Sequence, residues 1–301
     1  MDRFEAMSIL LAVVEKGSLS AAGRALRVPV PTLSRKLSDL EALLGTRLLI
    51  RTTRKLTLTD AGVGYVAAAR RILEQLDDAE REAAGEFITP KGELVVSAPI
   101  LFGRLHVLPV VADFLATFAE INVRLILSDR NVDLVSDHVD MAVRIGALPD
   151  SSMVATRVGS MRTVVCGAPA LLARQGTPMM PADLDQFPCV SIDGVLAATV
   201  WQMRMPGAKA VMEVPVHPRL LVSTAAAAAQ AAVMGVGLTR LFLYQVADAI
   251  AAGDLQVLLA DYEIEPAPIN LIHASRGQLP LKMRRFLDFA APRLRERIAP
   301  A

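Results

Sequence analysis

Polar and basic side chains gather at the start of a helix that the sequence predicts over residues 31–44. Thr32, Ser34, Arg35 and Lys36 fall in its first two turns. An arginine can donate two hydrogen bonds to guanine O6 and N7, and hydroxyl groups can bond bases or phosphates. A lone arginine on a helix is usually solvated surface, so its role depends on the elements around it.

Three short helices are predicted to position these side chains. Apolar residues recur at helical spacing in the first and third of them, at Phe4, Met7, Leu11, Val14 and at Leu33, Leu37, Leu40, Leu44. Gly17 and Gly45 end these two helices, and Ser18 caps the second, over residues 18–26. A short helix, a tight turn and a helix with a basic N-terminal end form a helix-turn-helix, whose second helix enters the DNA major groove.

Two short strands, 48–51 and 55–58, are predicted to form a hairpin wing after the third helix. Its basic tip suits contact with phosphates or with the minor groove, and comprises Arg51, Thr52, Thr53 and Arg54. Ser18 can act both as a helix cap and as a phosphate contact. Residues 1–59 carry 10 basic and 5 acidic side chains, and this positive excess favours an anionic polymer as partner.

A long helix is predicted over residues 60–84, followed by a hinge over 86–92. Its apolar stripe includes Val63, Val66, Ile72, Leu73 and Leu76. A helix of about 25 residues spans roughly 37 Å, which is too long for a small domain to cover. The stripe must therefore pack either against its own chain or against the same helix of a second subunit.

Strands and helices alternate from residue 93 onward, which predicts a parallel sheet with ligands bound beyond the carboxyl ends of its strands. The predicted strands are 94–97, 122–127, 140–144, 163–166, 189–192, 201–203, 211–216, 220–222, 235–240 in part, and 269–274. The predicted helices are 105–118, 224–234, 241–251 and 281–298, with a short helix or turn over 129–137.

Several classes of protein are not expected. The N-terminus resembles no secretory signal, and no run of about 18 apolar residues is free of charges, so we expect no membrane span. The two cysteines, Cys166 and Cys189, exclude a disulfide scaffold, fit the cytoplasm and have apolar neighbours that disfavour a redox switch. Metal-ligand spacing, phosphate loops and nucleophile motifs are missing, so we expect neither an enzyme nor a cofactor.

The N-terminal motifs resemble those of the LysR-type transcriptional regulators. The resemblance runs nearly continuously over residues 3–62 and rests on Ser18-Leu19-Ser20-Ala21-Ala22, Leu33-Ser34-Arg35-Lys36-Leu37, Leu44-Gly45, Arg51-Thr52-Thr53-Arg54 and Leu58-Thr59-Asp60-Ala61-Gly62. It implies a sequence-specific DNA-binding regulator, with residues 1–59 as a winged helix-turn-helix domain. It also implies that residues 60–90 hold a dimerisation helix, paired with its counterpart, and a hinge.

One segment departs from the family pattern. Pro29-Val30-Pro31 stands where many members have Ser-Gln-Pro. Val30 can touch a thymine methyl group, although it cannot hydrogen-bond a base edge. Pro31 and Val30 are therefore expected at the DNA surface, while base readout should depend more on Arg35, Thr32 and Ser34.

Ser97-Ala98-Pro99, Phe102-Gly103 and residues 139–146 resemble the effector domain of a LysR-type subgroup, which is similar to periplasmic binding proteins. The implied fold class is α/β, with two lobes around a cleft: residues 91–161 plus 268–301, and residues 162–267. A small organic acid or aromatic effector is implied in that cleft. The matching positions are Ser97, Ala98, Pro99, Phe102, Ser128, Asp129, Arg144, Gly146, Trp201, Thr224 and Thr239.

Other roles for these residues stay open. Ser97 could cap the next turn, Arg144 could pair with Asp140 or Asp129, and Trp201 could belong to the core. An enzyme with an accessory DNA-binding domain and a solute-binding protein are the alternatives to a regulator. The resemblance further implies a homodimer or tetramer, and RNA polymerase is a candidate partner at the promoter.

Overall fold

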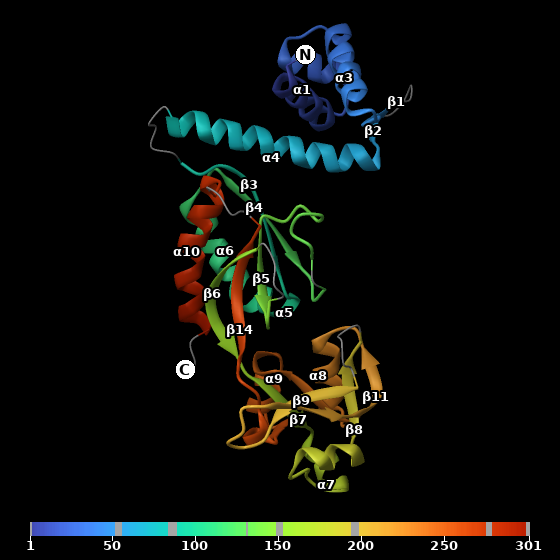
Figure 1. The fold of residues 1–301 in the computed structure, drawn as a ribbon, viewed down its shortest axis with the longest axis vertical. Helices are drawn as coiled ribbons and strands as arrows, with labels where there is room; N and C mark the ends of the chain where they lie inside the picture. Colours follow the sequence, from blue (N-terminus) through green and yellow to red (C-terminus); the bar gives the residue numbers. More distant parts are fainter. Residues whose placement is uncertain are drawn as a thin grey trace. The chain divides into compact units, whose positions relative to one another are not determined.

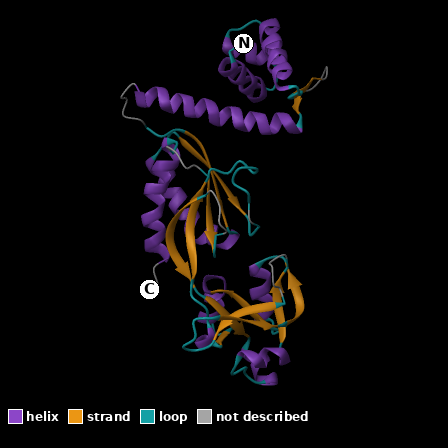
Figure 2. Cartoon of the chain, in the orientation of Figure 1, coloured by secondary structure: helices purple, strands orange, loops and turns teal. Residues whose placement is uncertain are grey.

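The computed structural model describes residues 2–51, 56–83, 89–130, 132–148, 153–193, 199–274 and 279–298. The chain forms two compact units, residues 1–92 and 93–301, and each is described by itself. Figure 1 labels the elements along the chain, and Figure 2 shows that the first unit is mainly helical whereas the second combines sheets with helices.

The first unit is a winged helix-turn-helix followed by a long helix, as predicted. Its elements are α1 (Arg3–Lys16), α2 (Leu19–Leu26), α3 (Val30–Leu44), β1 (Leu49–Arg51), β2 (Leu56–Leu58) and α4 (Asp60–Ala83). Strands β1 and β2 pair antiparallel, with Leu49 opposite Leu58. A hairpin directly after the second helix of the helix-turn-helix is the arrangement expected of a wing.

The ends of these helices follow local sequence signals. Gly17 and Gly45 adopt left-handed conformations, with φ of 70° and 67°, at the C-termini of α1 and α3. The Ser18 hydroxyl accepts a hydrogen bond from the Ala21 amide at 3.1 Å and so caps α2. The predicted end of the first helix and both predicted ends of the second and third are therefore confirmed to within one residue.

The buried side of α1 differs from the predicted one. Phe4 is 45% exposed, whereas Leu10 is fully buried together with Ile9 and Val13. The helix contacts α2, α3 and α4, so its buried arc is wide and is centred on Leu10. The spacing of apolar residues identified a helix, but the neighbours of that helix decide which side is buried.

Each lobe of the second unit is built on its own sheet. The first sheet has the order β4-β3-β5-β14-β6 and consists of β3 (Gly92–Ala98), β4 (Ile121–Leu127), β5 (Met141–Ile145), β6 (Val154–Met161) and β14 (Ala267–His273). The second has the order β11-β8-β12-β7-β13 and consists of β7 (Thr163–Gly167), β8 (Pro188–Ile192), β11 (His217–Val222), β12 (Leu238–Phe242) and β13 (Gln256–Leu258). A separate hairpin joins β9 (Val200–Arg204) to β10 (Val211–Pro215).

Both sheets are mixed, which corrects the prediction of a parallel sheet. Strands β3 and β5 are parallel, but β14 runs antiparallel to both β5 and β6. In the second sheet, β12 is parallel to β8 and antiparallel to β7. The chain leaves the first lobe after β6 and re-enters it with β14, and a strand that returns from another lobe need not follow a right-handed crossover.

Helices cover the sheets of both lobes. In the first lobe these are α5 (Ile100–Phe102), the π-helical turn η1 (Gly103–Val107), α6 (Leu108–Thr117) and α10 (Leu281–Ile298). In the second they are α7 (Pro169–Gln175), α8 (Ala225–Val233), α9 (Leu243–Ala251) and the 3₁₀ turns η2 (Pro181–Gln186) and η3 (Ala260–Tyr262). The sequence did not predict β6, β13 or α7, whose short or mixed patterns carry little periodicity.

The continuous helical stretch Ile100–Thr117 is long and apolar enough, by length and composition alone, to cross a membrane. Core helices of globular domains pass the same test. Phe102, Val110 and Phe114 of this stretch are almost fully buried in the first lobe, where they pack with Phe286 of α10. The apolar character of the stretch is thus accounted for by the core of the lobe.

Candidate DNA-binding and effector sites

The N-terminal end of α3 presents an exposed surface. Pro29 precedes the helix without a side-chain cap, and its carbonyl accepts hydrogen bonds from the Thr32 and Leu33 amides at 3.0 and 3.2 Å. Arg35 is exposed, as are Val30 and Pro31, whereas Thr32 and Ser34 are partly exposed. Leu33 and Leu37 are buried beneath this surface and hold the helix on the domain. The side chains predicted to meet DNA therefore share one accessible end of α3.

Lys36 lies differently from its neighbours. Its ammonium group forms an ion pair with Glu5 of α1, and its side chain is 23% exposed. Its charge is therefore partly neutralised within the domain, and its aliphatic stem helps to join α3 to α1. Of the basic residues at the start of α3, Arg35 is the one with the freer access to a partner.

The wing is held in place by polar contacts from Glu41 of α3 and from Thr59, the residue that precedes α4. The Glu41 carboxylate accepts hydrogen bonds from the Leu48 and Leu49 amides at 2.8 and 3.0 Å. Thr59 donates to the Arg47 carbonyl at 2.7 Å. The wing residues Thr52, Thr53 and Arg54 lie outside the described residues, and only the backbone of Arg51, in β1, is described. Glu41 was not predicted as a site residue, because a glutamate on a helix has no distinctive signal.

We expect Glu41→Ala to lower the free energy of unfolding of the first unit by about 1–3 kcal/mol, because two backbone amides lose a charged acceptor. DNA affinity should fall with it, since β1 would lose its anchor. Both amides donate to the same carboxylate oxygen, so Glu41→Gln should retain most of the stability. Thermal unfolding measures the effect, with the exposed Glu15→Ala as control. A Glu41→Ala protein with unchanged Tm would show that these amide contacts do not anchor the wing.

The predicted stripe on α4 divides into two parts. Val66 is 8% exposed and belongs to the core of its own domain, which corrects its assignment to a dimer surface. Ala69 is also fully buried there. Val63 and Ile72 are 55% and 38% exposed, and Leu73 and Leu76 are partly exposed. The domain thus covers one side of the helix and leaves a second apolar side accessible.

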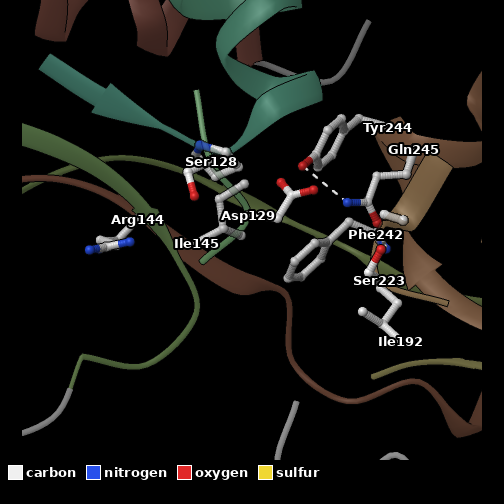
Figure 3. Close-up of a pocket in the computed structure, with 11 residues that line it drawn as sticks. Ser128, Asp129, Arg144, Ile145, Ile192, Ser223, Phe242, Tyr244 and Gln245 are labelled. Carbon is white, nitrogen blue, oxygen red and sulfur yellow. Dashed lines mark hydrogen bonds between the residues drawn. The ribbon is translucent and has the colours of Figure 1, made fainter. Parts of the chain in front are cut away.

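A pocket of about 170 Å³ lies between the two lobes of the second unit. Its wall is formed by residues of both lobes: Pro99, Ser128, Asp129, Arg144, Ile145, Ile192, Ser223, Ala225, Phe242, Tyr244 and Gln245 (Figure 3). Pro99, Ser128, Asp129 and Arg144 were predicted here, since each lies at or just after the end of a first-lobe strand. The second-lobe residues were not predicted.

The other predicted effector residues lie elsewhere. Ser97, Ala98 and Phe102 are buried, being 2%, 1% and 0% exposed. Gly146 has φ of 114° at the end of β5, and the Thr224 hydroxyl accepts from the Ala227 amide at 3.3 Å as the cap of α8. These residues shape the backbone around the pocket, but they are not among its described lining residues.

Trp201 and Thr239 require a correction. Trp201, on β9, is 5% exposed and packs in the core of the second lobe with Met203 and Val214. Thr239, on β12, is 1% exposed and donates to the Val190 carbonyl at 3.0 Å. Neither side chain faces the pocket, because both point into the packed interior of the second lobe.

Hydrogen bonds organise the second-lobe wall of the pocket. The Gln245 side chain accepts from the Phe242 amide at 3.0 Å and donates to the Tyr244 hydroxyl at 3.2 Å. Burial raises the pKa of Tyr244 to about 12, and the charge of Asp129 acts in the same direction. Tyr244 is therefore a neutral phenol at physiological pH and keeps its O–H as a donor.

Hydrogen bonds also hold the first-lobe wall. Asp129 accepts from the Ile100 amide at 3.0 Å, so its carboxylate stands at the start of α5. The Arg144 guanidinium donates to the Val132 carbonyl. Burial lowers the pKa of Arg144, but an arginine stays charged over the physiological range.

The two cysteines are buried in the second lobe. Burial raises the pKa of Cys166 and of Cys189 to about 12, so both remain thiols at neutral pH. They flank β12 from β7 and β8 and belong to different hydrophobic clusters. These facts disfavour a redox role, in line with the apolar residues that flank them.

Two family models match the chain in the order of its two units. The model of the bacterial regulatory helix-turn-helix protein, LysR family, matches residues 4–63, and that of the LysR substrate binding domain matches residues 89–295. The chain belongs to the LysR family of transcriptional regulators. The winged helix-turn-helix of this LysR regulator is thus a DNA-binding domain, and its two-lobed unit is an effector-binding domain.

Curated relatives and solved structures agree with this LysR assignment. The LysR regulator is 33% identical to an HTH-type transcriptional regulator of Xanthomonas campestris pv. campestris, over 95% of this chain and 84% of that protein. It is 31% identical to the HTH-type transcriptional activator AaeR of Escherichia coli, over 94% and 91%. CrgA, a LysR-type regulator from Neisseria meningitidis, has 30% identity and a TM-score of 0.59, with 96% and 98% covered.

Membership of the LysR family decides between the alternatives. LysR regulators bind DNA and small-molecule effectors and are oligomeric, soluble proteins. The protein is therefore a transcriptional regulator and not an enzyme or a solute-binding protein.

Proposed function

We propose that this LysR regulator binds operator DNA through α3 of two subunits and that a small molecule between the lobes controls it. The observation that carries the proposal is the pocket wall, to which both lobes contribute. A ligand that contacts both lobes can favour one arrangement of the lobes over another, which is the requirement for a population shift. The second unit then signals to the DNA-binding domain through α4.

The proposed division of labour follows the chain. Residues 1–59 bind DNA, residues 60–90 link and dimerise, and residues 91–301 bind the effector. Within the last part, residues 91–161 with 268–301 form one lobe and residues 162–267 the other. The two separate sheets support this division, as do the passages of the chain between them near Arg162 and Pro266.

We expect Arg35→Ala to weaken binding to the cognate operator about ten- to hundred-fold. One bidentate contact to a base provides about 1–3 kcal/mol of discrimination, and the exposed position of Arg35 supports that role. Fluorescence anisotropy at fixed salt, with the operator and a scrambled duplex of equal length, measures the effect. A scrambled duplex serves as the control because phosphate contacts are common to both. If both affinities fall equally, Arg35 contacts phosphate and reads no base.

The effector is proposed to be a small organic acid or an aromatic compound. Phe242 and Tyr244 provide ring surface, and Ile145 and Ile192 provide apolar wall. The volume is below the roughly 300–1,000 Å³ of sites for drug-sized ligands, so a small metabolite suits it.

Filling the pocket is expected to abolish the effector response. Ser223 is exposed and lines the pocket, so Ser223→Phe should occupy the space without disturbing the fold. A compound at about 100 times its Kd stabilises the native state by about 2.7 kcal/mol, which raises Tm by roughly 5–10 °C. The screen tests organic acids, amines and aromatic compounds by thermal shift. A compound that raises the Tm of the unaltered protein should no longer raise the Tm of Ser223→Phe. It should still raise the Tm of Ser160→Phe, on the outer strand β6. Shifts that persist in Ser223→Phe would place the ligand elsewhere.

We also propose macromolecular partners and a location for this LysR regulator. The accessible side of α4 supports a homodimer, and two such dimers would make the tetramer. RNA polymerase is the proposed target of the regulator at the promoter. The cytoplasm is the proposed location, since operator DNA lies there.

A further inference from the structure

Among the residues that the structure describes, the interlobe pocket is lined by two charged side chains, Asp129 and Arg144. The Arg144 guanidinium donates to the Val132 carbonyl, and in Figure 3 it stands apart from the group formed by Asp129, Phe242 and Tyr244. The Asp129 carboxylate is drawn beside the Tyr244 hydroxyl, and its charge acts on that phenol. The charge that meets a ligand at the aromatic side of the pocket is therefore negative.

The Asp129 carboxylate retains capacity for a ligand. A carboxylate offers about four acceptor sites, and the Ile100 amide occupies one of them at 3.0 Å. This contact fixes the orientation of the carboxylate with respect to the backbone. Among the described residues no ammonium or guanidinium pairs with Asp129.

Two aromatic residues, Phe242 and Tyr244, line the same pocket as this carboxylate (Figure 3). Phe242 and Tyr244 are nearly parallel, with an angle of 15° and 6.2 Å between ring centroids. Ring faces attract cations, and the combination of a carboxylate with aromatic faces is a common way to recognise an ammonium group. An anionic ligand at the same place would instead meet a like charge and the negative faces of the rings.

Ser128, which precedes Asp129, offers few free hydrogen-bond donors to an anionic ligand. The Ser128 hydroxyl accepts from the Arg130 amide at 3.1 Å, and the Ser128 amide donates to the Ala98 carbonyl at 3.0 Å. Both polar groups are thus engaged in the turn that follows β4. The first-lobe wall around Asp129 is arranged to accept hydrogen bonds from a ligand more than to donate them.

We propose that the effector carries a protonated amine, which binds the Asp129 carboxylate beside the rings of Phe242 and Tyr244. The proposal rests on the effector role of the pocket and narrows its ligand to amine-bearing small metabolites. The apolar part of the ligand packs against Ile145 and Ile192 of the two lobes. This replaces the organic acid of the broader proposal, because a carboxylate ligand beside Asp129 would meet a like charge.

The test compares amines with acids of the same shape on the full-length protein. Phenethylamine is paired with 3-phenylpropionate, and putrescine with succinate, in thermal-shift and calorimetric titrations. At least one amine is expected to raise Tm, and neither acid. Asp129→Asn keeps the acceptor for the Ile100 amide, and it should weaken amine binding about ten- to hundred-fold, as expected for loss of a charge-assisted hydrogen bond. Asp113→Asn, an exposed position on α6, is the matched control and should bind as the unaltered protein does.

Each other outcome overturns the inference. The amine assignment is wrong if the acids bind and the amines do not, if neither amine binds, or if Asp129→Asn leaves amine affinity unchanged. Ser223→Phe separates this result from failure of the pocket itself. If acids bind and Ser223→Phe abolishes their binding, the pocket is the effector site but prefers anionic ligands to amines. If amines bind equally to Ser223→Phe, the pocket is not their site.

Discussion

Leu73→Asp is expected to make the DNA-binding domain monomeric and to weaken operator binding by about 10²–10⁴-fold. Leu73 is partly exposed on α4 beside Ile72, which is 38% exposed. An aspartate there would place an unpaired charge in the helix pair, which is strongly unfavourable. Two linked recognition helices bind two half-sites with a high effective concentration, and a monomer loses that advantage.

The measurement uses residues 1–92, which form a compact unit with its own hydrophobic core. Sedimentation gives the oligomeric state, circular dichroism gives the fold, and operator titration gives the affinity. Leu73→Met conserves volume and apolar character, so it should remain dimeric. A Leu73→Asp variant that stays dimeric and binds normally would exclude α4 as the dimer helix. One that unfolds would show that Leu73 packs within its own domain.

Phe102→Ala is expected to destabilise the second unit by about 3–5 kcal/mol, which corresponds to a fall in Tm of roughly 10 °C. The ring is fully buried and stands 4.7 Å from the His106 ring and 5.6 Å from the Tyr244 ring, between centroids. Its removal would leave a cavity where the first lobe meets α9 of the second. Thermal unfolding should show the loss, while DNA binding by the first unit persists.

Ile100→Ala serves as the control, because Ile100 is 44% exposed and its truncation should cost under about 1 kcal/mol. The sequence suggested that Phe102 contacts the effector, whereas the structure places it behind the pocket wall. A Phe102→Ala protein with unchanged Tm and no effector response would support direct contact and contradict the packing role.

Local signals were sufficient to locate the helices of the DNA-binding domain. Ser18, Gly17 and Gly45 mark helix ends because capping hydrogen bonds and left-handed turns involve only neighbouring residues. The polar start of α3 was likewise evident from spacing, and the motifs around Arg35 resemble the family that the comparisons then confirmed. In this part of the chain the structure added the anchoring role of Glu41 and the pairing of Lys36 with Glu5.

Residues of both lobes were predicted to line the effector pocket, but only first-lobe predictions are among its described lining residues. Pro99, Asp129 and Arg144 could be found because residues near the ends of neighbouring strands meet at one edge of a sheet. Phe242 and Tyr244 could not be predicted as pocket residues, because their position depends on which end of the second lobe faces the first lobe. Trp201 was assigned to the cleft, but packing against the β9–β10 hairpin buries it in the core.

The sequence by itself determined the family, the order of the domains, the helix-turn-helix and the amphipathic character of α4, because these depend on local pattern. Only the tertiary structure decided which apolar residues each neighbour covers. Val66 and Ile72 belong to the same stripe, yet α1 and the domain core bury the first and leave the second exposed. Periodicity defines the faces of a helix, whereas contacts between segments distant in sequence decide what each face meets.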